Sequence, residues 1–177
     1  MKSHPVEVDA FAAQARAFLA WCEMPHGEKS NEDFRYEALH QVATAYVAAL
    51  NLPGADFRDA PEPPLISAEK RRSLAANLGM LPFQYYWEVF TPSDLDGDKE
   101  PVCGDLFDDF LDIFGDLSAG RWIFDRGHVE TAVYTWRLMF GAHWGRHAVS
   151  AMHALHSFDP DAGKIRSNIS LERPRGE

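Results

Sequence analysis

The stretch from His128 to about Ser157 constrains the fold most, because it combines the length of a long helix with helical apolar spacing. Its apolar side chains recur at intervals of three, four or seven residues and so share one face. They are Val129, Val133, Trp136, Phe140, Trp144, Ala151 and Leu155. Such a face has to be buried against other elements, so the stretch predicts a packed helical core.

Four other segments show helical spacing. We predict helices over Val6 to Glu23, Ser30 or Asn31 to Leu50, Ala68 to Met80 and Asp105 to about Arg126. No segment alternates long enough to predict a sheet, and Tyr85–Phe90 is either a short buried helix or an extended segment. The expected fold is therefore all-α: a single-domain bundle of about five helices with a long C-terminal helix. The domain should cover residues 1–160, with a flexible tail at 161–177.

Charge and composition exclude several functions. The chain of 177 residues has a formal net charge of -10, which disfavours binding to nucleic acid and to anionic membrane surfaces. It contains neither a secretory signal nor an apolar run long enough to span a membrane. Cys22 and Cys103 form no metal-binding or disulfide pattern, so we expect a cytoplasmic protein.

Two histidines, His143 and His147, lie four residues apart in the longest predicted helix. That spacing puts both rings on one face, where a divalent transition metal could bridge them. The metalloprotease pattern requires Glu after the first histidine, and Trp144 stands there instead. The favoured interpretation is a pair of core histidines without a metal. Each ring would be hydrogen-bonded to a carboxylate, a tyrosine or a backbone carbonyl.

An acidic run, Asp108-Asp109-Phe110-Leu111-Asp112, lies on the predicted helix at Asp105 to Arg126. Carboxylates on one helix face suit a hard cation such as Mg²⁺. In isoprenoid synthases such a run holds magnesium, but this chain is short and has no second acidic cluster to complete that site. We interpret the run as a polar stripe that faces water, or that pairs with Arg137 or Arg146.

Three pieces of the sequence occur together in a recognisable order. They are Tyr85–Phe90, then Glu100–Val102 leading into Asp108–Ile113, and then Trp136 followed by His143–Ala148. In order and spacing they resemble the bacterial family of domain of unknown function 5063, over roughly residues 30 to 157. The resemblance implies a small helical protein in which the acidic run and the histidine run belong together, and it implies no activity. The chain departs from the family pattern at Phe114, where we expect Tyr.

The favoured function is a non-catalytic protein-binding or scaffold domain that needs no cofactor. A buried polar cluster would fix how the helices pack. Its candidate members are Asp108, Asp109, Asp112, Arg137, His143, Arg146 and His147. The partner would be another protein or a second copy of the chain, and the candidate contact surface consists of Tyr85, Tyr86, Trp87 and Phe90.

The alternative is a metal-dependent hydrolase. His143 and His147 would bind a divalent transition metal, and aspartates of the 105–126 helix would complete its coordination. Arg146 or Arg137 would then neutralise an anionic substrate. The sequence favours the non-enzymatic function, because the histidine spacing alone is common.

Overall fold

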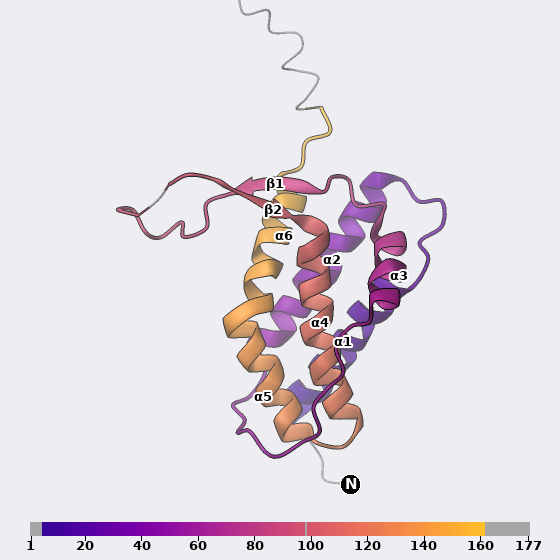
Figure 1. Cartoon of the computed structure of the whole chain (residues 1–177), viewed down its shortest axis with the longest axis vertical. Helices are drawn as coiled ribbons and strands as arrows, with labels where there is room; N and C mark the ends of the chain where they lie inside the picture. The colour runs from indigo at the N-terminus through magenta and orange to yellow at the C-terminus, as the bar shows by residue number, and fades with distance from the viewer. Residues whose placement is uncertain (1–4, 98, 162–177) are drawn as a thin grey trace, which may run out of the picture.

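The protein is a single-domain helical bundle, as predicted, in a computed structural model that describes residues 5–97 and 99–161 (Figure 1). All of the predicted tail except Asp161 lies outside the described residues. The helices are α1 (Val6–Glu23), α2 (Asn31–Leu50), α3 (Ala68–Leu78), α4 (Leu106–Asp125), α5 (Val129–Met139) and α6 (Gly145–Ser157). Within the described ranges, none of these helices has the length and hydropathy needed to cross a bilayer.

The helices begin where the sequence supplies a capping side chain. Ser30 Oγ accepts a hydrogen bond from the Asp33 amide, and Ser67 Oγ accepts one from the Lys70 amide. Asp105 does the same for the amides of Phe107 and Asp108 at the start of α4. Each cap satisfies amides that have no partner inside the helix, so these starting points could be predicted from local sequence.

The core is rich in aromatic side chains, and Trp136 and Trp144 are fully buried within it. The Trp136 indole packs directly over Gly120 of α4, and a β-carbon at that glycine would overlap the ring. Trp136 Nε1 donates to the Leu117 carbonyl at 3.2 Å. Gly120 therefore sets how closely α4 and α5 approach.

Helices α5 and α6 form the one long rod that was predicted, joined by the π-helical turn η1 (Phe140–Trp144). Buried or partly buried core residues recur at intervals of four from Trp136 through Phe140 and Trp144 to Ala148. An α-helix has 3.6 residues per turn, so a run of such intervals drifts around its surface. The wider π turn takes up this drift and keeps the core face aligned.

A small antiparallel hairpin corrects the prediction that the chain contains no sheet. Strands β1 (Tyr85–Glu88) and β2 (Val102–Asp105) pair with Tyr85 opposite Asp105 and Glu88 opposite Val102. The hairpin lies across one end of the bundle, above the start of α4 and the end of α6 (Figure 1). Of the two structures considered for Tyr85–Phe90, the extended one is therefore observed.

His26 is a buried histidine away from the hairpin. Its ring lies 4.7 Å from the Trp21 ring centroid and 4.6 Å from that of Phe34. Neither ring nitrogen has a hydrogen-bond partner among the described residues. Burial lowers the pKa of His26 below its ordinary value of 6.5, so the native state holds the ring neutral.

We expect His26→Leu to raise the free energy of unfolding by about 1 kcal/mol at neutral pH, because two unsatisfied polar atoms leave the interior. The gain should grow as the pH falls below about 6.5, since the unfolded chain then protonates His26 while the native state resists it. Urea denaturation at about pH 8 and about pH 5 measures both effects. Replacing the exposed His40 by alanine is the control, and an equal pH response in that variant would contradict the assignment to His26.

Candidate functional site

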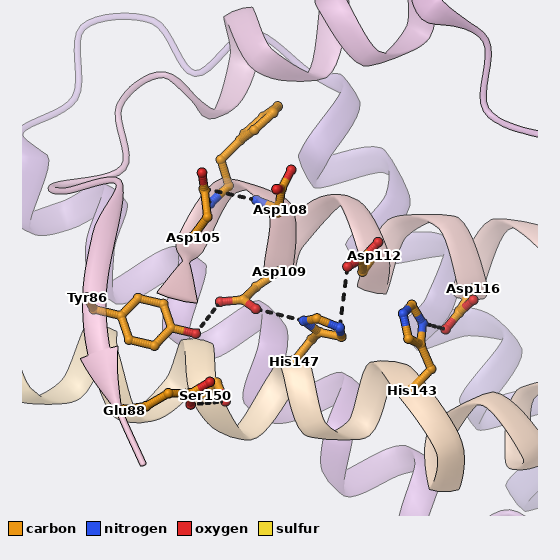
Figure 2. A network of polar contacts seen from close by, with 11 residues as sticks. Tyr86, Glu88, Asp105, Asp108, Asp109, Asp112, Asp116, His143, His147 and Ser150 are labelled. Atoms are coloured by element: carbon orange, nitrogen blue, oxygen red, sulfur yellow. Dashed lines mark hydrogen bonds and ion pairs between the residues drawn. The ribbon is translucent and has the colours of Figure 1, made fainter. Parts of the chain in front are cut away.

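Eight side chains meet between the hairpin, α4 and the η1–α6 rod, and we call them the polar cluster (Figure 2). They are Tyr86, Glu88, Asp109, Asp112, Asp116, His143, His147 and Ser150. The three aspartates follow one another at helical spacing along α4, and His143, His147 and Ser150 do the same along the rod. Spacings of three, four and seven residues keep side chains on one helix face, so the two rows oppose each other.

Asp109 is the centre of the polar cluster and only 5% exposed. Its Oδ2 accepts from the Tyr86 hydroxyl at 2.6 Å, and its Oδ1 lies 2.8 Å from His147 Nδ1. The hydrogen bond to Asp109 raises the pKa of His147 above its ordinary value, although burial opposes this. Burial and the bond to Asp109 raise the pKa of Tyr86, which keeps its hydroxyl a donor. One carboxylate thus ties the hairpin to both helices.

The two histidines have carboxylate partners from successive turns of α4. His143 Nδ1 lies 2.8 Å from Asp116 Oδ2, and His147 Nε2 lies 3.3 Å from Asp112 Oδ2. The two imidazole rings are 4.8 Å apart at 70°. One ring nitrogen of each histidine and one oxygen of Asp112 all lie within 4.8 Å of one another. This grouping has the composition of a divalent-metal site.

An open cleft of about 650 Å³ borders the polar cluster. The hairpin forms one wall with Tyr86 and Glu88, and Asp112 and both histidines line the opposite side. A second hollow of about 340 Å³ lies beyond Asp112 and His143, where Arg71 and residues 63–66 line it. The convergent Asp112 and His143 therefore border both hollows.

The hairpin is held by polar contacts in addition to Tyr86. Ser150 Oγ donates to Glu88 Oε2 at 2.5 Å. The Arg146 guanidinium donates to the Phe90 carbonyl at 2.6 Å and lies 3.0 Å from the centroid of the Phe90 ring. At the other end of the strand, the Leu106 amide donates to the Gln84 carbonyl at 2.8 Å. These contacts fix which face of β1 is turned toward solvent.

The structure brings together most of the predicted polar residues. Asp109, Asp112, His143 and His147 are in direct contact as a group, and Asp108 and Arg146 line the same cleft. Asp109 does not face water, unlike the stripe expected from the sequence. Burial, together with the charges of Asp105 and Asp112, raises the pKa of Asp108.

Arg137 lies apart from the polar cluster. Its guanidinium donates to the Leu52 carbonyl, just beyond the end of α2. It therefore ties the rod to the segment that follows α2, and among the described residues it makes no hydrogen bond or ion pair with the histidines. Phe114, where the family resemblance suggested Tyr, is buried in the core, with Lys70 Nζ 5.8 Å from its ring centroid.

Sequence reasoning missed Asp116, Glu88 and Ser150. A usable signal existed for Asp116, because it lies four residues after Asp112 and seven after Asp109, spacings that keep all three carboxylates on one helix face. Tyr86 was assigned to a contact surface, but its hydroxyl points inward to Asp109 (Figure 2). The ring lies over Gly104, its partner on β2, where a side chain would collide with it.

Comparisons with known proteins support the fold. The model of a family described as domain of unknown function (DUF5063) matches residues 2–160 of the chain, which confirms the resemblance and extends it to α1. The crystal structure of protein BF1032 from Bacteroides fragilis is similar, with a TM-score of 0.71 and 22% identity. The similarity covers 89% of this chain and 96% of that one, and at this identity it shows the fold alone. The comparison with curated proteins found no match.

Proposed function

Because the chain belongs to the family of domain of unknown function DUF5063, whose description assigns no activity, we propose a function from its geometry: a binding domain whose hairpin contacts another protein. The observation that carries this proposal is the outer face of β1. Tyr85 is 62% exposed and Trp87 is 69% exposed, although large aromatic side chains are usually buried. Exposed aromatic side chains grouped on a rigid element are typical of protein contact sites.

Charge indicates the kind of partner. The loop between the two strands carries Asp94, Asp96, Asp98 and Glu100, with Lys99 as its sole basic residue. An aromatic face beside such a loop favours a partner segment rich in Lys or Arg, because cations are attracted both to the carboxylates and to the ring faces. We therefore assign the hairpin to a basic segment of another protein.

The polar cluster supports this function by holding the hairpin rigid. Tyr86 and Glu88 alternate with Tyr85 and Trp87 along β1, so the inward pair binds the bundle while the outward pair stays exposed. A rigid contact surface loses less conformational entropy on binding than a mobile one. This role agrees with a scaffold function for the buried carboxylate and histidine side chains.

The test begins with a photo-reactive phenylalanine derivative at position 85, which keeps an aromatic ring there and leaves Trp87 in place, introduced into the full chain in its host cells. A protein cross-linked there is then purified, and its affinity is measured by calorimetry. We expect Trp87→Ala to weaken binding about 30-fold, the usual effect of removing an aromatic side chain that dominates an interface. Affinity should also fall with increasing salt, since the partner is basic.

Tyr36→Ala is the matched control for this experiment, because Tyr36 is a similarly exposed aromatic residue on α2. It should leave the affinity unchanged. Unchanged binding in both Tyr85→Ala and Trp87→Ala would contradict the proposal. A partner that proves to be a second copy of the chain, detected as dimers by sedimentation, would keep the contact surface but overturn the basic partner.

The convergence of Asp112, His143 and His147 favours a second candidate function, the metal-dependent hydrolase. A divalent ion with an open coordination position can lower the pKa of a bound water to about 7 and so supply a nucleophile. The same cleft offers Arg146 to an anionic substrate. This function requires an ion at those three side chains.

A further inference from the structure

The histidine half of the polar cluster contains more acceptors than donors. The Nδ1 atoms of His143 and His147 each lie 2.8 Å from a carboxylate oxygen, of Asp116 and Asp109 respectively. A carboxylate can only accept, so each Nδ1 carries the proton and donates it. In a neutral imidazole the other nitrogen, Nε2, then presents a lone pair.

These lone pairs converge with a third acceptor. His147 Nε2 lies 3.3 Å from Asp112 Oδ2, and a nitrogen of His143 is within 4.8 Å of both ligand atoms. An acceptor facing another acceptor at that distance is unfavourable unless a cation lies between them. The cation is either a proton on His147, which would make it an imidazolium between two aspartates, or a metal ion shared by all three side chains.

Two features of the geometry favour the metal ion. Histidines that ligate metals usually donate their second nitrogen to a carboxylate, and here both histidines do so. A proton on His147 would link only His147 and Asp112, whereas an ion can engage all three side chains. In a tetrahedral site, two ligand atoms bound to zinc at about 2.0 Å lie about 3.3 Å apart. Asp112 Oδ2 and His147 Nε2 are 3.3 Å apart.

We propose that Asp112, His143 and His147 bind one divalent transition-metal ion, with Asp109 and Asp116 as positioning residues that orient the two imidazoles. Two nitrogens and one carboxylate oxygen suit Zn²⁺, Fe²⁺, Co²⁺ or Ni²⁺ and not Mg²⁺ or Ca²⁺, which take oxygen ligands. The three ligands line the 650 Å³ cleft, so the ion keeps coordination positions open to it. The site requires no protein partner and is independent of binding at the hairpin.

Calorimetric titration of the full chain with Zn²⁺ tests the site, after expression without a metal-affinity tag and treatment with a chelator. We expect one equivalent of Zn²⁺ to bind and to raise the melting temperature, because an ion that binds only the native state stabilises it. Mg²⁺ should do neither. Bound Co²⁺ should show the visible absorption of a site with nitrogen and oxygen ligands.

Variants identify the ligands. His143→Ala and Asp112→Asn should remove the stoichiometric binding of Zn²⁺ while the far-ultraviolet spectrum stays that of the folded chain. If the His143→Ala variant does not fold, the His143→Gln variant takes its place in the test, because glutamine has a side-chain volume close to that of histidine. Asp116→Asn should weaken Zn²⁺ binding about 10- to 100-fold without removing it, the usual effect of replacing a carboxylate that orients a ligand.

His153→Ala is the matched control, because His153 lies exposed on the same rod, in α6, and lines a different hollow. It should retain full affinity for Zn²⁺. The proposal is overturned if the unmodified chain binds Zn²⁺ with a Kd weaker than about 1 mM. The cation would then be the proton on His147, and the His147 imidazolium would link Asp109 and Asp112. A loss in His153→Ala as large as that in His143→Ala would overturn it as well.

Discussion

Asp109→Ala is expected to lower the free energy of unfolding by about 3 kcal/mol and to release the hairpin from the bundle. Asp109 is the shared acceptor for Tyr86 and His147, and it is almost completely buried. Its removal leaves the Tyr86 hydroxyl and His147 Nδ1 without the buried acceptor that lies between them. The loss should therefore exceed the stabilisation that the two hydrogen bonds contribute.

Urea denaturation measures the first effect, and hydrogen exchange at the amides of β1 and β2 measures the second. A chelator in all samples removes any contribution from a bound ion. Asp108→Ala is the matched control, since the neighbouring carboxylate is exposed and should change stability by no more than about 0.5 kcal/mol. Equal losses of unfolding free energy in the two variants would show that Asp109 does not hold the hairpin to the bundle.

Gly120→Ala is expected to lower the free energy of unfolding by about 2 to 3 kcal/mol, the range for overpacking a core. The new methyl group would occupy space filled by the Trp136 indole. Moving the indole would break its hydrogen bond to Leu117, and Phe11 and Phe124 pack against the displaced ring. Little adjustment is available there, because Trp136 is fully buried.

A second glycine-to-alanine substitution on α4, at Gly115, supplies the control. At Gly115 an added methyl group would make an ordinary contact with Ile66 Cδ1 at 3.4 Å. Gly115→Ala should therefore stabilise the chain by up to about 1 kcal/mol, because alanine favours helices more than glycine does. Thermal and urea denaturation of both variants compare the two effects, and opposite signs are expected. Destabilisation of similar size in both would indicate that helix α4 tolerates no larger residue at any of its glycines.

The helices could be predicted from the sequence because their signals are local. Ser30, Ser67 and Asp105 provide caps within a few residues of each helix start, and Pro53 follows the end of α2 closely. The apolar spacing then identifies the face that becomes buried. None of these signals requires knowledge of where the rest of the chain lies.

The hairpin could not be predicted in the same way. Tyr85, Tyr86 and Trp87 are consecutive aromatics, so the alternation that indicates a strand is hidden even though successive residues face opposite sides. The partner strand contains Cys103 and Gly104, which favour no strand on their own. Pairing across an intervening loop is a tertiary event that local composition does not specify.

The candidate site was predictable to the extent that spacing fixes a helix face. Asp109, Asp112, His143 and His147 follow that rule and come together. Arg137 does not, because its spacing of six residues from His143 puts it on another face of the rod and because its guanidinium reaches a backbone carbonyl. Backbone carbonyls carry no sequence signature, so this contact was not accessible to pattern analysis.

The π turn also determines where the length of the rod can change. It holds one residue more than an ordinary turn, so deletion of a single codon within residues 140–144 would restore a plain α-helix. Trp136 and Ala148 would then be separated by about 11 steps of ~100° each, close to three full turns, so Trp136 would stay on the face that carries Ala148. A deletion elsewhere in the rod would instead rotate one half against the other by about 100° and expose part of the core face. We therefore expect the rod to tolerate the loss of a residue within 140–144 better than at any position in α5 or α6.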